Sequence, residues 1–116
     1  MKPKVSEHDV QTQILNWLKQ VGIYHYRQNT GGAKLKGFFV KFGKKGAPDI
    51  VAVHNGRYIG IEVKAKGGVQ SPEQKSFQLD ITKADGLYIL AYSLEDVTKV
   101  LGRVALQMVI KKALES

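Results

Sequence analysis

The sequence predicts a mixed α/β domain in which helices pack on a small sheet. Apolar residues recur at helical spacing near both ends of the chain, and short β-branched and aromatic runs lie between turn signals in its middle. We expect approximately the order α-β-β-β-α-β-α, with one additional short strand after the first. The 116 residues show no repeat or linker, so residues 1–116 are expected to form a single domain.

The chain should begin with a helix followed by a strand. Ser6 suits an N-cap and Gly22 a helix end. The apolar stripe between them consists of Val10, Ile14, Trp17, Leu18 and Val21. A strand is expected over residues 23–27, a mobile glycine-rich loop over 29–37, and a short strand over 38–42. The alternating aromatic residues are assigned to the core rather than to base stacking, namely Tyr24, Tyr26, Phe38, Phe39 and Phe42.

The middle of the chain predicts a hairpin and a second helix. Two apolar strands, ending at Val53 and beginning at Tyr58, flank Asn55-Gly56, which is a strong hairpin signal. Ser71-Pro72-Glu73-Gln74 then opens a helix that should run to about Ala84, with serine as N-cap, proline at the first position and glutamine at the third.

The C-terminal third predicts a buried strand and a final helical region. Residues 87–92 are densely apolar, and Ser93 suits the next N-cap. We expect Gly102 to split this region into helices over 94–101 and 103–114. The apolar segment 104–110 is expected to pack on the protein's own sheet, with a dimer surface as its alternative.

Composition limits the possible functions. The chain has no cysteine, which excludes disulfides, thiolate zinc sites and thiol catalysis. No apolar run approaches the length of a membrane span or a signal peptide, so we expect a cytoplasmic protein without a membrane partner.

The net charge of +8 favours a polyanionic partner, because the basic residues cluster. Between residues 27 and 66 the only acids are Asp49 and Glu62. The basic residues of this zone are Arg27, Lys34, Lys36, Lys41, Lys44, Lys45, Arg57, Lys64 and Lys66. Such a zone can neutralise phosphates and still reserve one anionic spot for a cation. A charge that only maintains solubility is the alternative.

Asp49, Glu62 and Lys64 are the candidate chemical centre. Side chains alternate along a strand, so Glu62 and Lys64 share a face, and a tight hairpin brings Asp49 to the same end of the sheet. Two carboxylates can hold Mg²⁺ or Mn²⁺ through oxygen, and the backbone carbonyl of Val63 could add a ligand. Lys64 would orient the attacking water or neutralise charge in the transition state. A surface acid pair with a same-face lysine is the alternative.

Neighbouring residues fit roles in such a centre. Pro48 fixes the backbone before Asp49, and Gly46 permits close approach of a phosphate backbone. Glu7 borders the core-facing stripe of the first helix, either as a third carboxylate of the site or as a first-turn acid that suits the helix dipole. Gln74 could reach the site or complete a capping box with Ser71, and Gln11 could bind phosphate or remain exposed. The histidines His8, His25 and His54 lack metal-ligand spacing.

Together these residues resemble the virus-type replication-repair nuclease (VRR-NUC) family of the PD-(D/E)xK superfamily. The resemblance covers about residues 6–100. It rests on Glu7 and Gln11, Gly43-x-x-Gly46-x-Pro48-Asp49-Ile50, Ile61-Glu62-Val63-Lys64 and Ser71-Pro72-Glu73-Gln74.

The resemblance implies a restriction-endonuclease-like core and cleavage of phosphodiester bonds with Mg²⁺ or Mn²⁺. It implies that Asp49 and Glu62 bind the metal, that Glu7 is an additional acid, that Lys64 is the catalytic lysine, and that Gln74 is the family glutamine. Small stand-alone members are typical of phages and bacteria and can act as homodimers on four-way (Holliday) DNA junctions. A bacterial or phage-infected host cell is therefore the expected setting.

We accordingly expect a structure-selective DNA endonuclease of DNA repair type. Its expected DNA-binding residues are Arg27, Lys34, Lys36, Lys44, Lys45, Lys66 and Gln11. A non-catalytic basic DNA-binding module is one alternative. A restriction-type duplex endonuclease is another, although the short loops offer little material for reading base edges.

Overall fold

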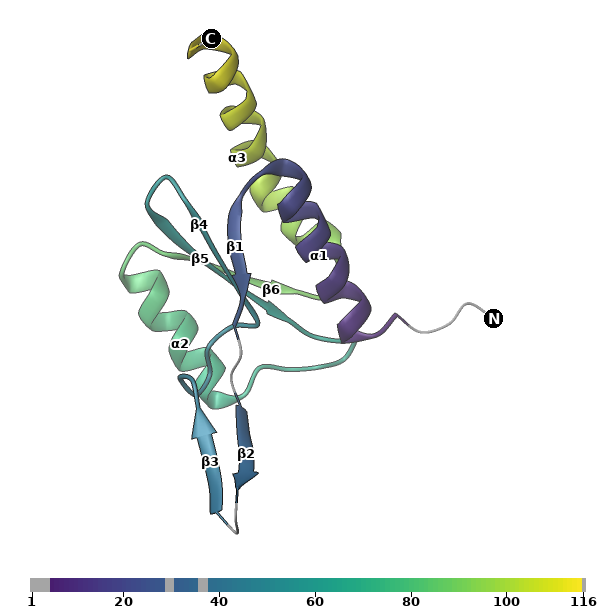
Figure 1. Cartoon of the computed structure of the whole chain (residues 1–116), viewed down its shortest axis with the longest axis vertical. Coiled ribbons are helices and arrows are strands. Elements are labelled where there is room, and N and C mark those ends of the chain that lie inside the picture. Colours follow the sequence, from purple (N-terminus) through teal and green to yellow (C-terminus); the bar gives the residue numbers. More distant parts are fainter. Residues whose placement is uncertain (1–4, 29–30, 36–37, 116) are drawn as a thin grey trace.

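A four-stranded mixed sheet forms the centre of the protein (Figure 1). The computed structural model describes residues 5–28, 31–35 and 38–115, without the side chains of 31–35, 38–42, 104, 105 and 108. The sheet has the order β1-β4-β5-β6 and is formed by β1 (Tyr24–Arg27), β4 (Ile50–His54), β5 (Arg57–Val63) and β6 (Leu87–Ala91). β1, β4 and β5 are antiparallel, whereas β6 runs parallel to β5.

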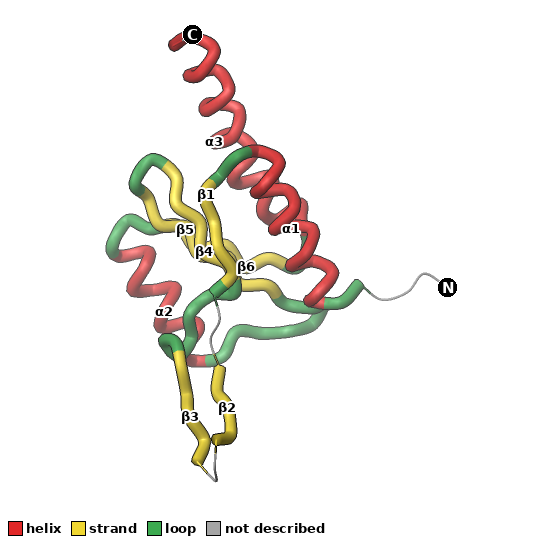
Figure 2. Tube along the Cα trace, in the orientation of Figure 1, coloured by secondary structure: helices red, strands yellow, loops and turns green. Residues whose placement is uncertain are grey.

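Helices cover both faces of the sheet. α1 (Glu7–Val21) and α3 (Leu94–Glu115) pack on one face, and α2 (Pro72–Lys83) packs on the other (Figure 1). In the sequence, a separate hairpin of β2 (Gly31–Leu35) and β3 (Phe38–Phe42) is inserted between β1 and β4. It projects from the body of the protein (Figure 2). Apart from this hairpin, the order is the expected α-β-β-β-α-β-α.

The core lies between the sheet and the pair α1 and α3. Because strand side chains alternate, β4 and β5 turn one apolar set toward these helices. The buried side chains of the core include Ile14 and Leu18 of α1, Ile50 and Ala52 of β4, Ile59, Ile61 and Val63 of β5, and Val97 and Leu101 of α3. The other residues of β5, among them Glu62, face α2.

The expected caps and turn are confirmed. Ser6 caps α1 by accepting the backbone N–H of Asp9, and Ser71 caps α2 by accepting that of Gln74. Asn55 and Gly56 both have positive φ angles, 51° and 75°, as a tight two-residue hairpin requires. These local signals fix where α1, α2 and the β4–β5 hairpin begin.

Four expectations about secondary structure and packing are wrong, and the last of them concerns the end of α3. Residues 31–35 form strand β2, not a loop, because each pairs with a residue of the aromatic strand β3, and pairing outweighs the weak strand propensity of glycine. α3 is continuous through Gly102, since a glycine costs a helix interior only about 1 kcal/mol relative to alanine. Tyr24 and Tyr26 are 69 % and 48 % exposed, because they lie on the face of β1 opposite α1, and α2 packs over β6 rather than over β1.

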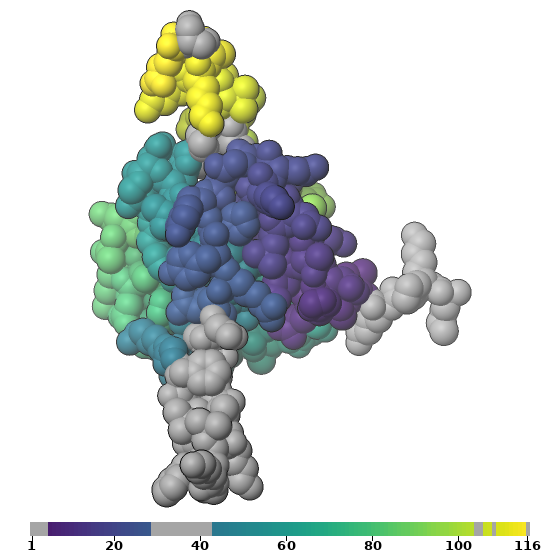
Figure 3. Space-filling model, in the orientation of Figure 1, coloured from purple at the N-terminus to yellow at the C-terminus, as the bar shows by residue number. Residues whose placement is uncertain are grey.

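The C-terminal half of α3 does not pack on the sheet as expected. Its last turns extend beyond the body (Figure 3), and Leu106, Val109 and Ile110 are exposed. The helix is simply longer than the sheet face that it covers. No helix in the described part of the chain is long and apolar enough to cross a membrane.

Candidate active site

The β4–β5 register brings the two predicted carboxylates together at one end of the sheet. Ile50 pairs with Ile61, so one further step sets Asp49 opposite Glu62. Oδ2 of Asp49 accepts the backbone N–H of Val63 at 2.8 Å, and the carbonyl of Asp49 accepts the N–H of Gln28 at 2.7 Å. Asp49 is therefore fixed between the strands on either side of it.

Pro48 and Gly46 hold the segment before Asp49 in place. Pro48 is fully buried on β5, and a Cβ on Gly60 would lie 2.9 Å from its Cγ. Gly46 has a φ of 85°, and a Cβ there would collide with the backbone carbonyl of Glu73. Gly46 thus makes room for the first turn of α2, which is a different neighbour from the expected phosphate backbone.

Glu62 is the one buried charged residue in the described part of the chain, with 2 % of its surface exposed. Its Oε1 accepts a hydrogen bond from Nε2 of Gln74 at 2.9 Å and lies 4.0 Å from Nζ of Lys64. Its Oε2 is buried and has no partner among the described residues. A buried carboxylate oxygen without a partner is costly, so this atom needs a proton or a cation.

Burial and the neighbouring carboxylate raise the pKa of Glu62. Desolvation is the largest cause, followed by the charge of Asp49 and by the hydrogen bond that the protonated Glu62 makes with Asp49. This pKa therefore rises from its usual value near 4.5 to about 8, against the opposing charge of Lys64. Two carboxyl groups that share one site cannot both be ionised cheaply. Without a cation, Glu62 therefore retains a proton at neutral pH.

Gln74 links the cap of α2 to this carboxylate. Its Oε1 accepts the backbone N–H of Ser71 at 2.8 Å, which turns its Nε2 toward Glu62. From the sequence, Gln74 could either complete the capping box with Ser71 or reach toward Glu62. In the structure it makes both contacts. The amide orientation is consequently set by two contacts at once.

A cleft of about 260 Å³ opens beside Asp49. The N-terminal turn of α1, the end of β1 and the end of β5 surround it. Its lining residues are Glu7, His8, Gln11, Arg27, Asp49 and Val63. Glu7 is near enough that its charge slightly raises the pKa of Glu62. No three Asp, Glu or His side chains converge as a metal cluster within the residues that the structure describes.

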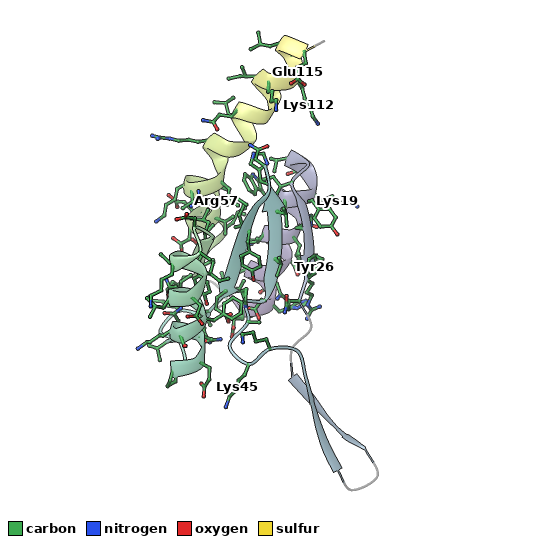
Figure 4. The ribbon with its side chains drawn as sticks, turned by 90° about the vertical axis from the view of Figure 1, so that its left-hand side faces the viewer. Lys19, Tyr26, Lys45, Arg57, Lys112 and Glu115 are labelled. Carbon is green, nitrogen blue, oxygen red and sulfur yellow. The ribbon has the colours of Figure 1, made fainter. Side chains whose placement is uncertain are left out.

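The predicted DNA-binding residues lie at several places around this end. Arg27 and Gln11 line the cleft, and Lys44 and Lys66 are exposed. Lys45 is exposed near the base of the β2–β3 hairpin (Figure 4), where its Nζ lies 3.1 Å from Glu73. The side chain of Lys34 and the whole of Lys36 lie outside the described residues.

The structure adds residues to the site region that the sequence did not single out. His8 lines the cleft, although its spacing from the other histidines gave no signal. Tyr88 lies on β6, on the face that Glu62 occupies on β5. Burial, with smaller contributions from the charges of Glu62 and Asp49, raises the pKa of the Tyr88 phenol to about 12, against a hydrogen bond with Gln70 that lowers it. Because side chains alternate along a strand, the sequence of β6 would have placed Tyr88 on the same face as Glu62 if the pairing of β5 with β6 had been known.

The residues present fit a hard divalent cation. The unpartnered Oε2 of Glu62 and the carboxylate of Asp49 supply oxygen donors of the kind that Mg²⁺ and Mn²⁺ prefer. A cation there would take the place of the proton that Glu62 otherwise holds. Lys64 adds a positive charge at the same place. The arrangement can therefore bind a metal beside a phosphate and stabilise negative charge that develops on it.

No model of a known protein family matches this chain, and no curated protein matches it.

Proposed function

We propose that this protein is a metal-dependent, structure-selective DNA endonuclease of the VRR-NUC type. The single observation that carries the proposal is the buried Glu62, whose unpartnered Oε2 lies in a site with Asp49 and Lys64. Structural acids are rarely buried with an unsatisfied oxygen, whereas metal-dependent hydrolases need such an oxygen as a ligand. Mg²⁺ or Mn²⁺ is the proposed cofactor.

The roles of the residues follow from their positions. Asp49 and Glu62 would hold the cation, and Glu7 and the carbonyl of Val63 are further oxygens at the same end of the sheet. The bound cation would polarise the scissile phosphate and lower the pKa of the attacking water. Lys64 would orient that water or neutralise charge on the phosphate. Gln74 would hold Oε1 of Glu62, leaving Oε2 for the cation.

The sheet supports the proposed restriction-endonuclease-like core. That core requires the order α-β-β-β-α-β-α, and the four central strands with α1, α2 and α3 follow it. The inserted β2–β3 hairpin is an addition to this core. It projects from the end of the body where α2 begins (Figure 2), and its sequence contains Lys34, Lys36 and Lys41.

DNA is the proposed substrate because of charge. The chain carries +8, and Arg27, Lys44 and Lys66 are exposed around the end of the sheet that holds the two carboxylates. Each lysine or arginine that meets a phosphate releases counterions, so binding should weaken steeply with salt. A branched substrate is proposed on the family resemblance.

A homodimer is proposed because the exposed end of α3 suits a second copy of the chain. Leu106, Val109, Ile110 and Leu114 recur at helical spacing, and each is at least 50 % exposed. Figure 4 shows these turns, with Lys112 and Glu115, clear of the sheet. An antiparallel pair centred near Val109 would bury this stripe and bring Glu115 close to the partner's Arg103. Two-fold symmetry would also supply two active sites for paired cuts on a junction.

The oligomeric state tests the dimer. Leu106→Glu with Ile110→Glu should convert a dimer to a folded monomer in analytical ultracentrifugation, because the charges cannot be buried in the pair. Val69→Glu, which charges a 78 % exposed apolar residue elsewhere, is the matched control and should remain dimeric. A wild-type protein that is monomeric at micromolar concentration would contradict the proposed pair.

A cleavage assay on branched and linear DNA tests the function. We expect the wild-type protein to cut a synthetic four-way junction with Mg²⁺ or Mn²⁺ and not with EDTA, and to cut linear duplex of the same sequence more slowly. Equal cutting of both would contradict junction selectivity. Salt-sensitive binding without any metal-dependent cutting would instead support a non-catalytic DNA-binding module.

A further inference from the structure

The aliphatic stem of Lys64 passes beside Gly68 in the loop between β5 and α2. A Cβ placed on Gly68 would lie 3.4 Å from Cβ and 3.6 Å from Cδ of Lys64, so only the width of one side-chain atom separates the stem from the Gly68 backbone. The same Cβ would lie 3.0 Å from the carbonyl oxygen of Ala65. Gly68 therefore lies beside the stem of Lys64, whose Nζ is 4.0 Å from Oε1 of Glu62.

Two hydrogen bonds hold Gly68. Its N–H donates to the carbonyl of Ala65 at 2.8 Å, which closes a tight turn. Its own carbonyl accepts the hydroxyl of Tyr92 at 2.8 Å. The first bond is internal to the loop. The second ties the loop to the end of β6, and it depends on one side chain.

Tyr92 is itself fixed beside Lys64. β5 and β6 pair up to Val63 and Ala91, and the N–H of Lys64 donates to the carbonyl of Ala91 at 2.9 Å. One further step along this register sets Tyr92 beside Lys64. The backbone N–H of Tyr92 donates to Oδ2 of Asp96 at 2.8 Å, which anchors Tyr92 to the first turn of α3.

We propose that Tyr92 is a positioning residue for Lys64, acting through its hydroxyl on the carbonyl of Gly68. The inference rests on the proposed function, in which Lys64 serves the cleavage step. Tyr92 touches neither substrate nor cation in this account. It keeps the Gly68 backbone against the lysine stem, so that the ammonium group remains at the carboxylate pair.

The test compares Tyr92→Phe with a matched loss of a hydroxyl elsewhere. Thr82→Val removes a hydroxyl that donates to the carbonyl of Gln78 at 2.7 Å, at the far end of α2. Under single-turnover conditions, Tyr92→Phe should lower the cleavage rate about two- to tenfold, the effect of one lost hydrogen bond, with DNA affinity unchanged. Thr82→Val should cleave at the wild-type rate.

A double-mutant cycle separates positioning from general damage to the fold. In the Lys64→Ala background, Tyr92→Phe should have no further effect on the residual rate, because it acts only through the lysine. Equal factors in both backgrounds would overturn the inference, and so would a wild-type rate for Tyr92→Phe alone.

Hydrogen exchange judges the structural part without any cleavage. In the metal-free protein, Tyr92→Phe should speed exchange of the Gly68 amide severalfold and Thr82→Val should not. Unchanged exchange at Gly68 would overturn the inference even if Lys64 proves essential. Faster exchange in a protein that never cuts DNA would instead count against the proposed function and leave the tie between Tyr92 and Gly68 supported.

Discussion

The two ends of the sheet contain different kinds of cleft. At the end that contains the β4–β5 turn, a cleft of about 600 Å³ lies between this turn and the C-terminal end of α2. There Nε of Arg57 donates to the carbonyl of Asp85. At the other end the cleft beside Asp49 has about 260 Å³. The smaller cleft is lined by Asp49, whose charge acts on the buried Glu62. In the proposed function the chemistry lies at the smaller cleft, because the buried carboxylate with an unpartnered oxygen belongs to that end of the sheet.

The largest expected effect separates the two ends by activity. Lys64→Ala should lower junction cleavage about 10²- to 10³-fold, since it removes a positive charge from a buried site that stabilises the transition state. Arg57→Ala removes a positive charge from the larger cleft and should retain activity within about twofold. Single-turnover rates, with thermal melting to verify folding, would measure both. A comparable loss of cleavage rate in the two variants would contradict the assignment of the chemistry to the carboxylate end of the sheet.

A smaller effect concerns stability at the carboxylate end. Glu62→Gln keeps the shape of the side chain and one acceptor oxygen for Gln74, and it removes a charge that is buried at a cost. We expect this variant to lose cleavage and yet, at about pH 9 without metal, to melt several degrees above the wild type. Differential scanning calorimetry in EDTA would measure the shift. Asp80→Asn, at an exposed position on α2, should melt like the wild type.

The pH dependence sharpens the same contrast. The folded protein holds the proton of Glu62 up to about pH 8, whereas an unfolded chain releases it near its usual pKa of 4.5. Between these values the folded state binds more protons, so this contribution to the free energy of unfolding is full at acid pH and falls as pH rises through 8. The metal-free wild type should therefore lose stability from about pH 5 to pH 9 relative to Glu62→Gln. Parallel melting curves for the two proteins would contradict the raised pKa.

Much of this fold could be predicted from local sequence signals. Ser6, Ser71 and Asn55-Gly56 mark helix starts and a hairpin by their own hydrogen-bonding and backbone preferences, and the structure has these elements where they were expected. The turn left the exact register ambiguous, but pairing centred on Asn55-Gly56 predicted that Asp49 and Glu62 lie at the same end of the sheet, as the structure shows. These features depend on residues that are close in sequence.

Other features depend on contacts that the sequence does not reveal. Strand β2 exists because β3 pairs with it, and Gly46 is required by the approach of α2. The position of Tyr92 beside Lys64 follows from the parallel pairing of β5 with β6, which are separated in the sequence by the whole of α2. Likewise, only the structure shows that Oε2 of Glu62 lacks a partner, because burial is a property of the packed chain.

Metal binding tests the central claim most directly. Isothermal titration with Mn²⁺ at about pH 7 should show binding to the wild-type protein, with release of close to one proton per ion, because the cation displaces the proton held by Glu62. Asp49→Asn and Glu62→Gln should each weaken binding at least about tenfold, and Asp80→Asn should not. Equal Mn²⁺ affinity in all four proteins, or binding without proton release, would contradict the assignment of the carboxylate pair as the metal site.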